Sequence, residues 1–138
     1  MIRSARATDV EDLVDLWARS GLHVDAACGS EELLRLLDLG TDLVLVDERD
    51  GSIVAAVMGT WDGRRGWVQR LATDADWRGK QIATDLLREL ESRLVAMGCT
   101  KINLLIEPAN SEIASFYESF GYSSDELIFM EKWTMPPQ

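Results

Sequence analysis

The stretch from Leu71 to Ala83, LATDADWRGKQIA, is the most informative about the fold. It passes from a strand pattern through a polar turn into a helix pattern. We expect a strand over 67–73 and a helix from about residue 82 onward. The first N–H groups of such a helix lack internal partners and carry partial positive charge, so this end favours a phosphate or pyrophosphate. Arg78 and Lys80 add full charges, and Gly79 allows close backbone approach. On these grounds alone, a solvated turn with two surface cations is an equally good interpretation.

The turn carries neither a P-loop nor a Gly-x-Gly-x-x-Gly dinucleotide motif. It resembles instead the acetyl-CoA signature Gln/Arg-x-x-Gly-x-Gly/Ala of the GNAT superfamily of N-acetyltransferases. Gln81 departs from that signature, because the family usually has glycine there. The resemblance implies that the strand segment Leu71, Ala72 and Thr73 pairs with the pantetheine arm of the cofactor. It implies also that the CoA pyrophosphate lies on the backbone amides of Arg78, Gly79, Lys80, Gln81, Ile82 and Ala83.

A second stretch, EPANSEIASFYESFGY from Glu107 to Tyr122, resembles the GNAT pattern Asn-x-x-Ala-x-x-Phe/Leu-Tyr-x-x-x-Gly-Phe/Tyr. The matching residues are Asn110, Phe116, Tyr117, Gly121 and Tyr122, and an alanine, Ala114, comes one place later than in many members. The resemblance implies that Asn110, Phe116 and Tyr117 belong to the cofactor site. Asn110 is also a good helix cap, and both roles are compatible.

Tyr117 is the candidate acid of this second stretch. Amine attack on a thioester expels a thiolate, whose thiol has a pKa of about 8.5, and a phenol of pKa about 10 remains protonated and can donate to it. The resemblance gives the matching tyrosine this role. Packing in an aromatic patch is the alternative interpretation.

Glu107 is the candidate base, because it follows a predicted buried strand near the expected splay of the sheet, whereas the strand Trp67–Leu71 contains no carboxylate. A solvated charge at the end of a strand is the simpler interpretation of Glu107. His23 is the only histidine and falls in a loop, so it is a weaker candidate base, and one histidine excludes a histidine-rich metal site. We therefore expect no metal.

The remaining pattern predicts further strands over 2–6, 43–46, 53–58, 101–106 and 127–133, and further helices over 9–20, from Ser30 to Gly40 and from Asn110 or Ser111. The resemblance implies a mixed α/β, GNAT-like fold. Its central, mostly antiparallel, splayed sheet has about six to seven strands, with about four helices. We expect a single domain over 1–138. The pattern Met-Gly-x-Trp-Asp-Gly-x-Arg-Gly within Val57–Gly66 is similar to that of small bacterial acetyltransferases of the YpeA type.

Composition narrows the class of protein further. The formal net charge is −10, which argues against nucleic-acid binding, and no apolar run is long enough to cross a bilayer. Two widely separated cysteines and the absence of a secretory leader lead us to expect a cytoplasmic protein. The acidic surface attracts cationic partners such as amines, or serves solubility alone.

Three functions stay open at this point. The first is transfer of acetyl from acetyl-CoA to a primary amine by direct attack in a ternary complex. The second is a non-catalytic acyl-CoA-binding sensor or regulatory module, which the missing strand carboxylate and Gln81 favour. The third is acetylation of protein N-terminal α-amines. The acceptor and the oligomeric state are not specified, although a homodimer is common in the superfamily.

Overall fold

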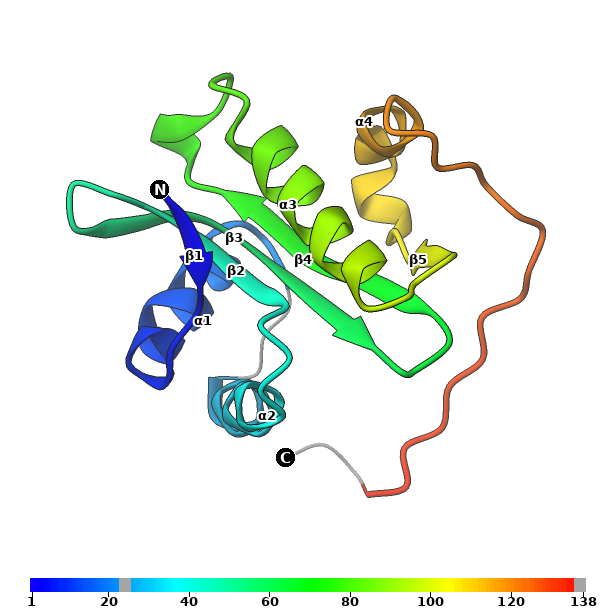
Figure 1. Cartoon of the computed structure of the whole chain (residues 1–138), viewed down its shortest axis with the longest axis horizontal. Coiled ribbons are helices and arrows are strands. Elements are labelled where there is room, and N and C mark those ends of the chain that lie inside the picture. Colours follow the sequence, from blue (N-terminus) through cyan, green and yellow to red (C-terminus); the bar gives the residue numbers. More distant parts are fainter. Residues whose placement is uncertain (23–25, 136–138) are drawn as a thin grey trace. The chain divides into compact units, whose positions relative to one another are not determined.

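The computed structural model describes residues 1–22 and 26–135, and of residues 26–28 it describes the backbone only (Figure 1). The chain forms two compact units, Met1–Leu104 and Leu105–Gln138. His23 lies outside the described residues. Within the described ranges, no helix is long and apolar enough to cross a membrane.

The first unit is built on one five-stranded sheet. Its strands lie in chain order, and each neighbouring pair is antiparallel except the last pair, which is parallel. The described residues thus contain five strands where the sequence predicts six to seven. The strands are β1 (Ile2–Ser4), β2 (Val44–Arg49), β3 (Ser52–Trp61), β4 (Gly66–Thr73) and β5 (Ile102–Leu104).

An Asp-Gly hairpin joins β2 to β3. Asp50 and Gly51 form a two-residue loop with φ values of 53° and 78°. Positive φ at both central residues is the geometry whose twist matches antiparallel strands, which explains the Asp-Gly pair. Arg49 then pairs with Ser52, so the loop fixes the register of β2 against β3.

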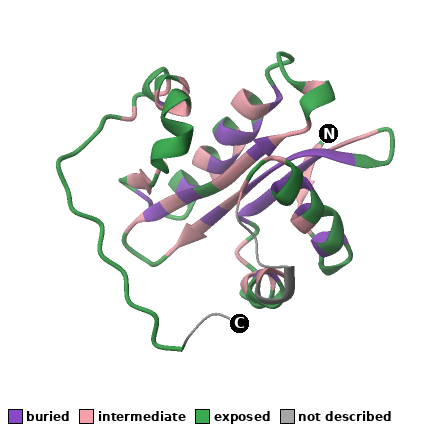
Figure 2. Cartoon of the chain, turned by 180° about the vertical axis from the view of Figure 1, so that it is seen from behind, coloured by how far each residue is buried: buried purple, intermediate pink, exposed green. Residues whose placement is uncertain are grey.

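Helices cover both faces of the sheet. On β3, Ala56 and Met58 face α1 (Val10–Arg19) and α2 (Ala26–Asp38), whereas Gly59 faces Leu90 of α3 (Ile82–Ala96). Alternate side chains of a strand point to opposite faces, so α3 lies on the face opposite α1 and α2. Figure 2 shows buried residues concentrated along the strands and on the helix faces that meet them.

The second unit carries a 3-10 helix, η3 (Pro108–Ile113), followed by α4 (Ala114–Glu118). The α-helix therefore begins later than the predicted Asn110 or Ser111. The predicted strand over 127–133 is wrong for this structure, because the segment has no regular secondary structure and Ile128 is 89% exposed. The apolar pattern indicates that these side chains can be buried, but a strand also needs a hydrogen-bonding neighbour, and the pattern does not supply one.

A buried ion-pair cluster ties the first strand to the first helix. Asp9, 7% exposed, accepts hydrogen bonds at 2.7 Å and 3.0 Å from the Arg3 guanidinium, and Arg3 also contacts Glu48 at 2.5 Å. The Arg3 hydrogen bonds hold the pKa of the Asp9 carboxyl below its usual value, despite the opposing effect of burial. The cluster fixes where α1 begins against the sheet.

Candidate active site

Strand β4 runs past its neighbour β5 and leaves one edge open. The last parallel pair joins Val68 to Leu104, whereas β4 continues to Thr73. Gln69–Thr73 therefore pair with β3 on one side, and within the described residues no strand pairs with them on the other. An exposed strand edge of this kind can accept an extended chain by backbone hydrogen bonds. Leu71, Ala72 and Thr73, the predicted pantetheine-binding residues, all lie on it.

The open edge contains a β-bulge. Ala56 pairs with Ala72 and Met58 with Gln69, so Arg70 and Leu71 together face the single residue Val57. Arg70 has a φ of 56°, in the left-handed region. A bulge re-aims backbone groups out of the ladder and is common next to active sites.

Trp17 of helix α1 contacts the bulge residue Arg70. The Trp17 indole N–H donates to the Arg70 carbonyl at 2.7 Å, and the Arg70 guanidinium lies 5.5 Å from the Trp17 ring centroid. Trp17 is 1% exposed, so this hydrogen bond is sheltered from water. Neither residue was predicted to belong to the site. Nothing in the sequence signals a bulge at an arginine, and its support comes from a residue 53 positions earlier.

The predicted pyrophosphate turn connects β4 to α3 directly. After Thr73 comes a single 3-10 turn, η2 (Ala75–Trp77), and α3 begins at Ile82. Gly79 and Gln81 have φ values of 78° and 62°. The turn is therefore left-handed at two positions, which explains why a glycine is usual where this chain has Gln81.

Side chains around the turn hold its shape. Asp74 accepts the backbone N–H of Asp76 at 3.0 Å and forms an ion pair with Arg19 of α1. The Trp77 ring has the Lys80 ammonium 5.9 Å from its centroid. Arg78, Gly79 and Lys80 are exposed and lie immediately before the N-terminus of α3. Positively charged side chains and free backbone N–H groups are therefore close together there.

The second unit contains the other predicted residues. Tyr117 is 7% exposed, and the rings of Phe116 and Tyr122 lie with centroids 5.4 Å and 5.6 Å from its own. Burial raises the pKa of Tyr117 to about 12, so its phenol stays protonated at neutral pH. The aromatic packing is thus observed, and it leaves the hydroxyl able to donate.

Asn110 and Glu107 lie in and next to η3. The Asn110 N–H donates to the Glu107 carbonyl at 2.8 Å, and both residues are exposed. Asn110 lies within η3 and does not cap α4, whose cap position is Ile113. Glu107 therefore shows no burial that would mark it as a base.

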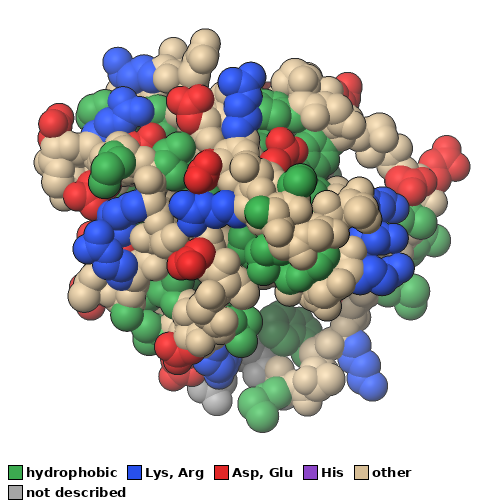
Figure 3. Space-filling view, viewed as in Figure 1, with side chains coloured by type: hydrophobic (Ala, Val, Ile, Leu, Met, Phe, Trp, Pro, Cys, Tyr) green, Lys and Arg blue, Asp and Glu red, His purple; other side chains and the backbone are tan. Residues whose placement is uncertain are grey.

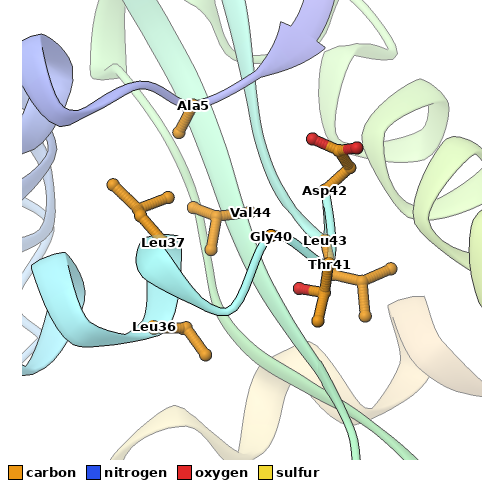
Figure 4. A pocket seen from close by; sticks show the side chains of 8 residues that line it. All are labelled: Ala5, Leu36, Leu37, Gly40, Thr41, Asp42, Leu43 and Val44. Atoms are coloured by element: carbon orange, nitrogen blue, oxygen red, sulfur yellow. The ribbon is translucent and has the colours of Figure 1, made fainter.

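One small pocket lies in the first unit, and none of the predicted site residues lines it. The end of α2, the following loop and the start of β2 line it, with Ala5 opposite (Figure 4). It offers about 30 Å³, room for about one or two water molecules. It is too small for a nucleotide cofactor. In the part of the chain that the structure describes, no three His, Cys, Asp or Glu side chains are grouped as metal ligands.

Comparison with known proteins places the chain in a family. The family model of the acetyltransferase (GNAT) family matches residues 10–122. The chain belongs to that family. An acetyltransferase of Sodalis glossinidius is 36% identical over 129 residues, which cover 94% of this chain and 91% of that protein.

Solved structures of low sequence identity share the fold. An aminoglycoside 6'-N-acetyltransferase of Acinetobacter haemolyticus has a TM-score of 0.79 at 17% identity, covering 99% of each chain. A predicted acetyltransferase of Clostridium acetobutylicum, solved with acetyl-CoA, has a TM-score of 0.71 at 21% identity, covering 95% of each chain. These likenesses show the GNAT-like α/β fold, whereas the family match and the acetyltransferase relatives support an acyltransferase activity.

Proposed function

We propose that this protein transfers an acetyl group from acetyl-CoA to a primary amine by direct attack, with the two units acting as one domain. The observation that carries the proposal is the open, bulged edge of β4 leading directly into the turn before α3. One continuous segment, Gln69–Ala83, thus offers a strand edge for an extended arm and a helix start for its phosphates.

The pyrophosphate is held at the turn by backbone amides and by two cations. Ile82 and Ala83 begin a helix of 15 residues, whose first N–H groups have no partners within the helix. Arg78 and Lys80, both exposed, supply positive charge beside them. Gln81 contributes its backbone in the left-handed conformation, so the turn survives without the usual glycine.

The reaction forms an N–C bond and breaks the C–S bond of the thioester. Backbone N–H groups at the bulge near Leu71 polarise the carbonyl as it becomes tetrahedral. Tyr117 then assists the departing thiolate. With a phenol pKa of about 12 and a thiol pKa of about 8.5, complete proton transfer is uphill by roughly 5 kcal/mol. Tyr117 therefore acts by a hydrogen bond to the sulfur, and the proton lost by the amine finally neutralises the thiolate.

The resemblance of Val57–Gly66 to the YpeA type supports membership of that group of small bacterial acetyltransferases. The use of acetyl-CoA as co-substrate supports a cytoplasmic location for the protein. A non-catalytic acyl-CoA sensor is favoured by one observation, the exposure of Glu107 together with the absence of a carboxylate from Trp67–Leu71. Acetylation of protein N-termini is distinguished by assay: peptides would be consumed in preference to small amines.

The first test is calorimetric titration of acetyl-CoA into the intact protein and into the Arg78→Ala/Lys80→Ala variant. Losing two charge-assisted contacts should weaken binding by roughly 10- to 100-fold or more. The Arg65→Ala/Lys101→Ala variant removes the same charge outside the turn and should bind normally. Absence of binding to the intact protein would remove the proposal.

Catalysis is tested by CoA release from the Tyr117→Phe variant. We expect turnover to fall while acetyl-CoA affinity is retained, because the phenol acts on the leaving group. Unchanged turnover would exclude Tyr117 from the mechanism. Tight acetyl-CoA binding without CoA release over a broad amine panel would favour the sensor.

A further inference from the structure

Arg70 occupies a special place in the first unit. It is the bulge residue of β4, its carbonyl is bound by the Trp17 indole, and its guanidinium lies over the same ring. Both ends of the residue are therefore held by α1. The side chain is directed to the α1 face of the sheet, next to the open edge that begins after Val68.

Within the part of the chain that the structure describes, no carboxylate neutralises the charge of Arg70. Some arginines of this unit lie against carboxylates: Arg3 against Asp9 and Glu48, Arg19 against Asp15 and Asp74, and Arg49 against Asp47. Others, such as Arg64 and Arg78, also have no carboxylate within 4.0 Å among the described residues, but both are exposed, whereas Arg70 is half-buried. Among the described residues, no carboxylate oxygen lies within 4.0 Å of the Arg70 guanidinium.

The chain as a whole is acidic. The sequence has 24 Asp and Glu against 14 Lys and Arg, and Figure 3 shows the two signs interspersed over one face of the molecule. Arg70 is nevertheless half-buried, with an aromatic ring as its neighbour. A guanidinium held in a fixed position and partly removed from water favours a carboxylate in two parallel hydrogen bonds.

We propose that Arg70 binds a carboxylate of the acceptor, so that the substrates are amino-acid-like primary amines with the carboxylate a few bonds from the nitrogen. This inference rests on the proposed function, which puts the thioester carbonyl at the N–H groups near Leu71. Arg70 immediately precedes Leu71. An acceptor anchored on Arg70 from the α1 face thus brings its amine to the reacting carbon.

The test compares acceptors that differ only in the anionic group. Glycine, β-alanine and a set of L-amino acids are each paired with the corresponding carboxamide, and kcat/KM is measured by CoA release. The carboxamide is the better nucleophile at neutral pH, because its amine has the lower pKa. A preference for the carboxylate must therefore come from the protein, and we expect at least about 10-fold.

Arg70→Gln should abolish this preference while leaving the affinity for acetyl-CoA unchanged. Glutamine is a suitable replacement, because the chain itself holds a glutamine at the similar φ of 62° at position 81. Arg70→Lys keeps the charge but loses the planar fork, so we expect an intermediate preference. Lys101→Gln removes an exposed charge elsewhere and should preserve the preference.

Two results would overturn the assignment: equal or faster reaction of the carboxamides with the intact protein, or a preference that persists in Arg70→Gln. If acetyl-CoA binds but none of these amines is consumed, N-acetylglycine and N-acetylglycinamide are titrated into the CoA-loaded protein. Binding of the acid alone, lost in Arg70→Gln, supports the site, whereas equal or absent binding overturns it. If the intact protein does not bind acetyl-CoA, the proposed function is wrong. Titration of N-acetylglycine without CoA then still tests whether Arg70 binds a carboxylate.

Discussion

Replacing Gln81 by glycine should stabilise the first unit. Gln81 has φ 62° and ψ 18° at the cap of α3. A side chain in this region costs roughly 1–2 kcal/mol, because its Cβ approaches the following carbonyl oxygen. Glycine removes that cost but frees the unfolded chain by about 0.4–1 kcal/mol. The net gain in unfolding free energy is therefore about 0.8 kcal/mol, which corresponds to a Tm rise of roughly 3 °C.

The matched control is Gln81→Ala, which removes the long side chain but keeps the Cβ and hence the strain. Urea unfolding of both variants separates the two effects, because only the glycine should gain stability. A glycine variant no more stable than the alanine variant would refute the claim that this position is strained. Both variants uncover the amides at the start of α3, so calorimetry should show tighter acetyl-CoA binding in both.

Three further changes test the support of the site. Trp17→Phe removes the donor to the Arg70 carbonyl, so it should lower the unfolding free energy by about 1–2 kcal/mol and reduce turnover more than acetyl-CoA affinity. The pKa of Asp9 is lowered in the folded protein, so the stability that Asp9 contributes is present above its unfolded pKa of about 3.9 and is lost as pH falls through the folded pKa. Asp9→Asn should therefore make the unfolding free energy, measured in urea, depend less on pH in the acid range. An unchanged pH dependence would show that the Arg3–Asp9 ion pair does not stabilise the fold. Gly59→Ala would put a Cβ 2.4 Å from a leucine methyl of α3, so thermal melting should show a loss of about 1–3 kcal/mol, and a normal Tm would mean that the helix shifts freely.

The strand, turn and helix around Leu71–Ala83 could be predicted from sequence, because each of its signals is local. Apolar residues mark the strand, Gly79 marks the turn and a leucine stripe marks the helix. The start of α2 was predicted too late, at Ser30, although Ala26 already begins the helix. Gly29 lies inside the helix, and Ala26 and Ala27, which have high helix propensity, form its first residues.

The bulge at Arg70 could not be predicted, because its cause is not local. Arginine has no preference for positive φ, and the conformation is fixed by an indole donor from α1. The predicted strand over 127–133 failed for a related reason. Its apolar residues favour burial, but a strand also needs a neighbouring strand to hydrogen-bond with. The pattern within the segment does not specify that neighbour.

The charges at the bulge also bear on how the acceptor loses its proton. An attacking amine must be neutral, and an α-amine of pKa about 8 needs little assistance at physiological pH. The carboxylate of an amino acid works against this, because a neighbouring negative charge favours the ammonium form. Pairing that carboxylate with the Arg70 guanidinium cancels the effect, and any remaining positive potential favours the neutral amine. The strand Trp67–Leu71 contains no carboxylate, and Glu107 is exposed. An acceptor whose carboxylate is neutralised by Arg70 therefore needs no dedicated general base in this protein.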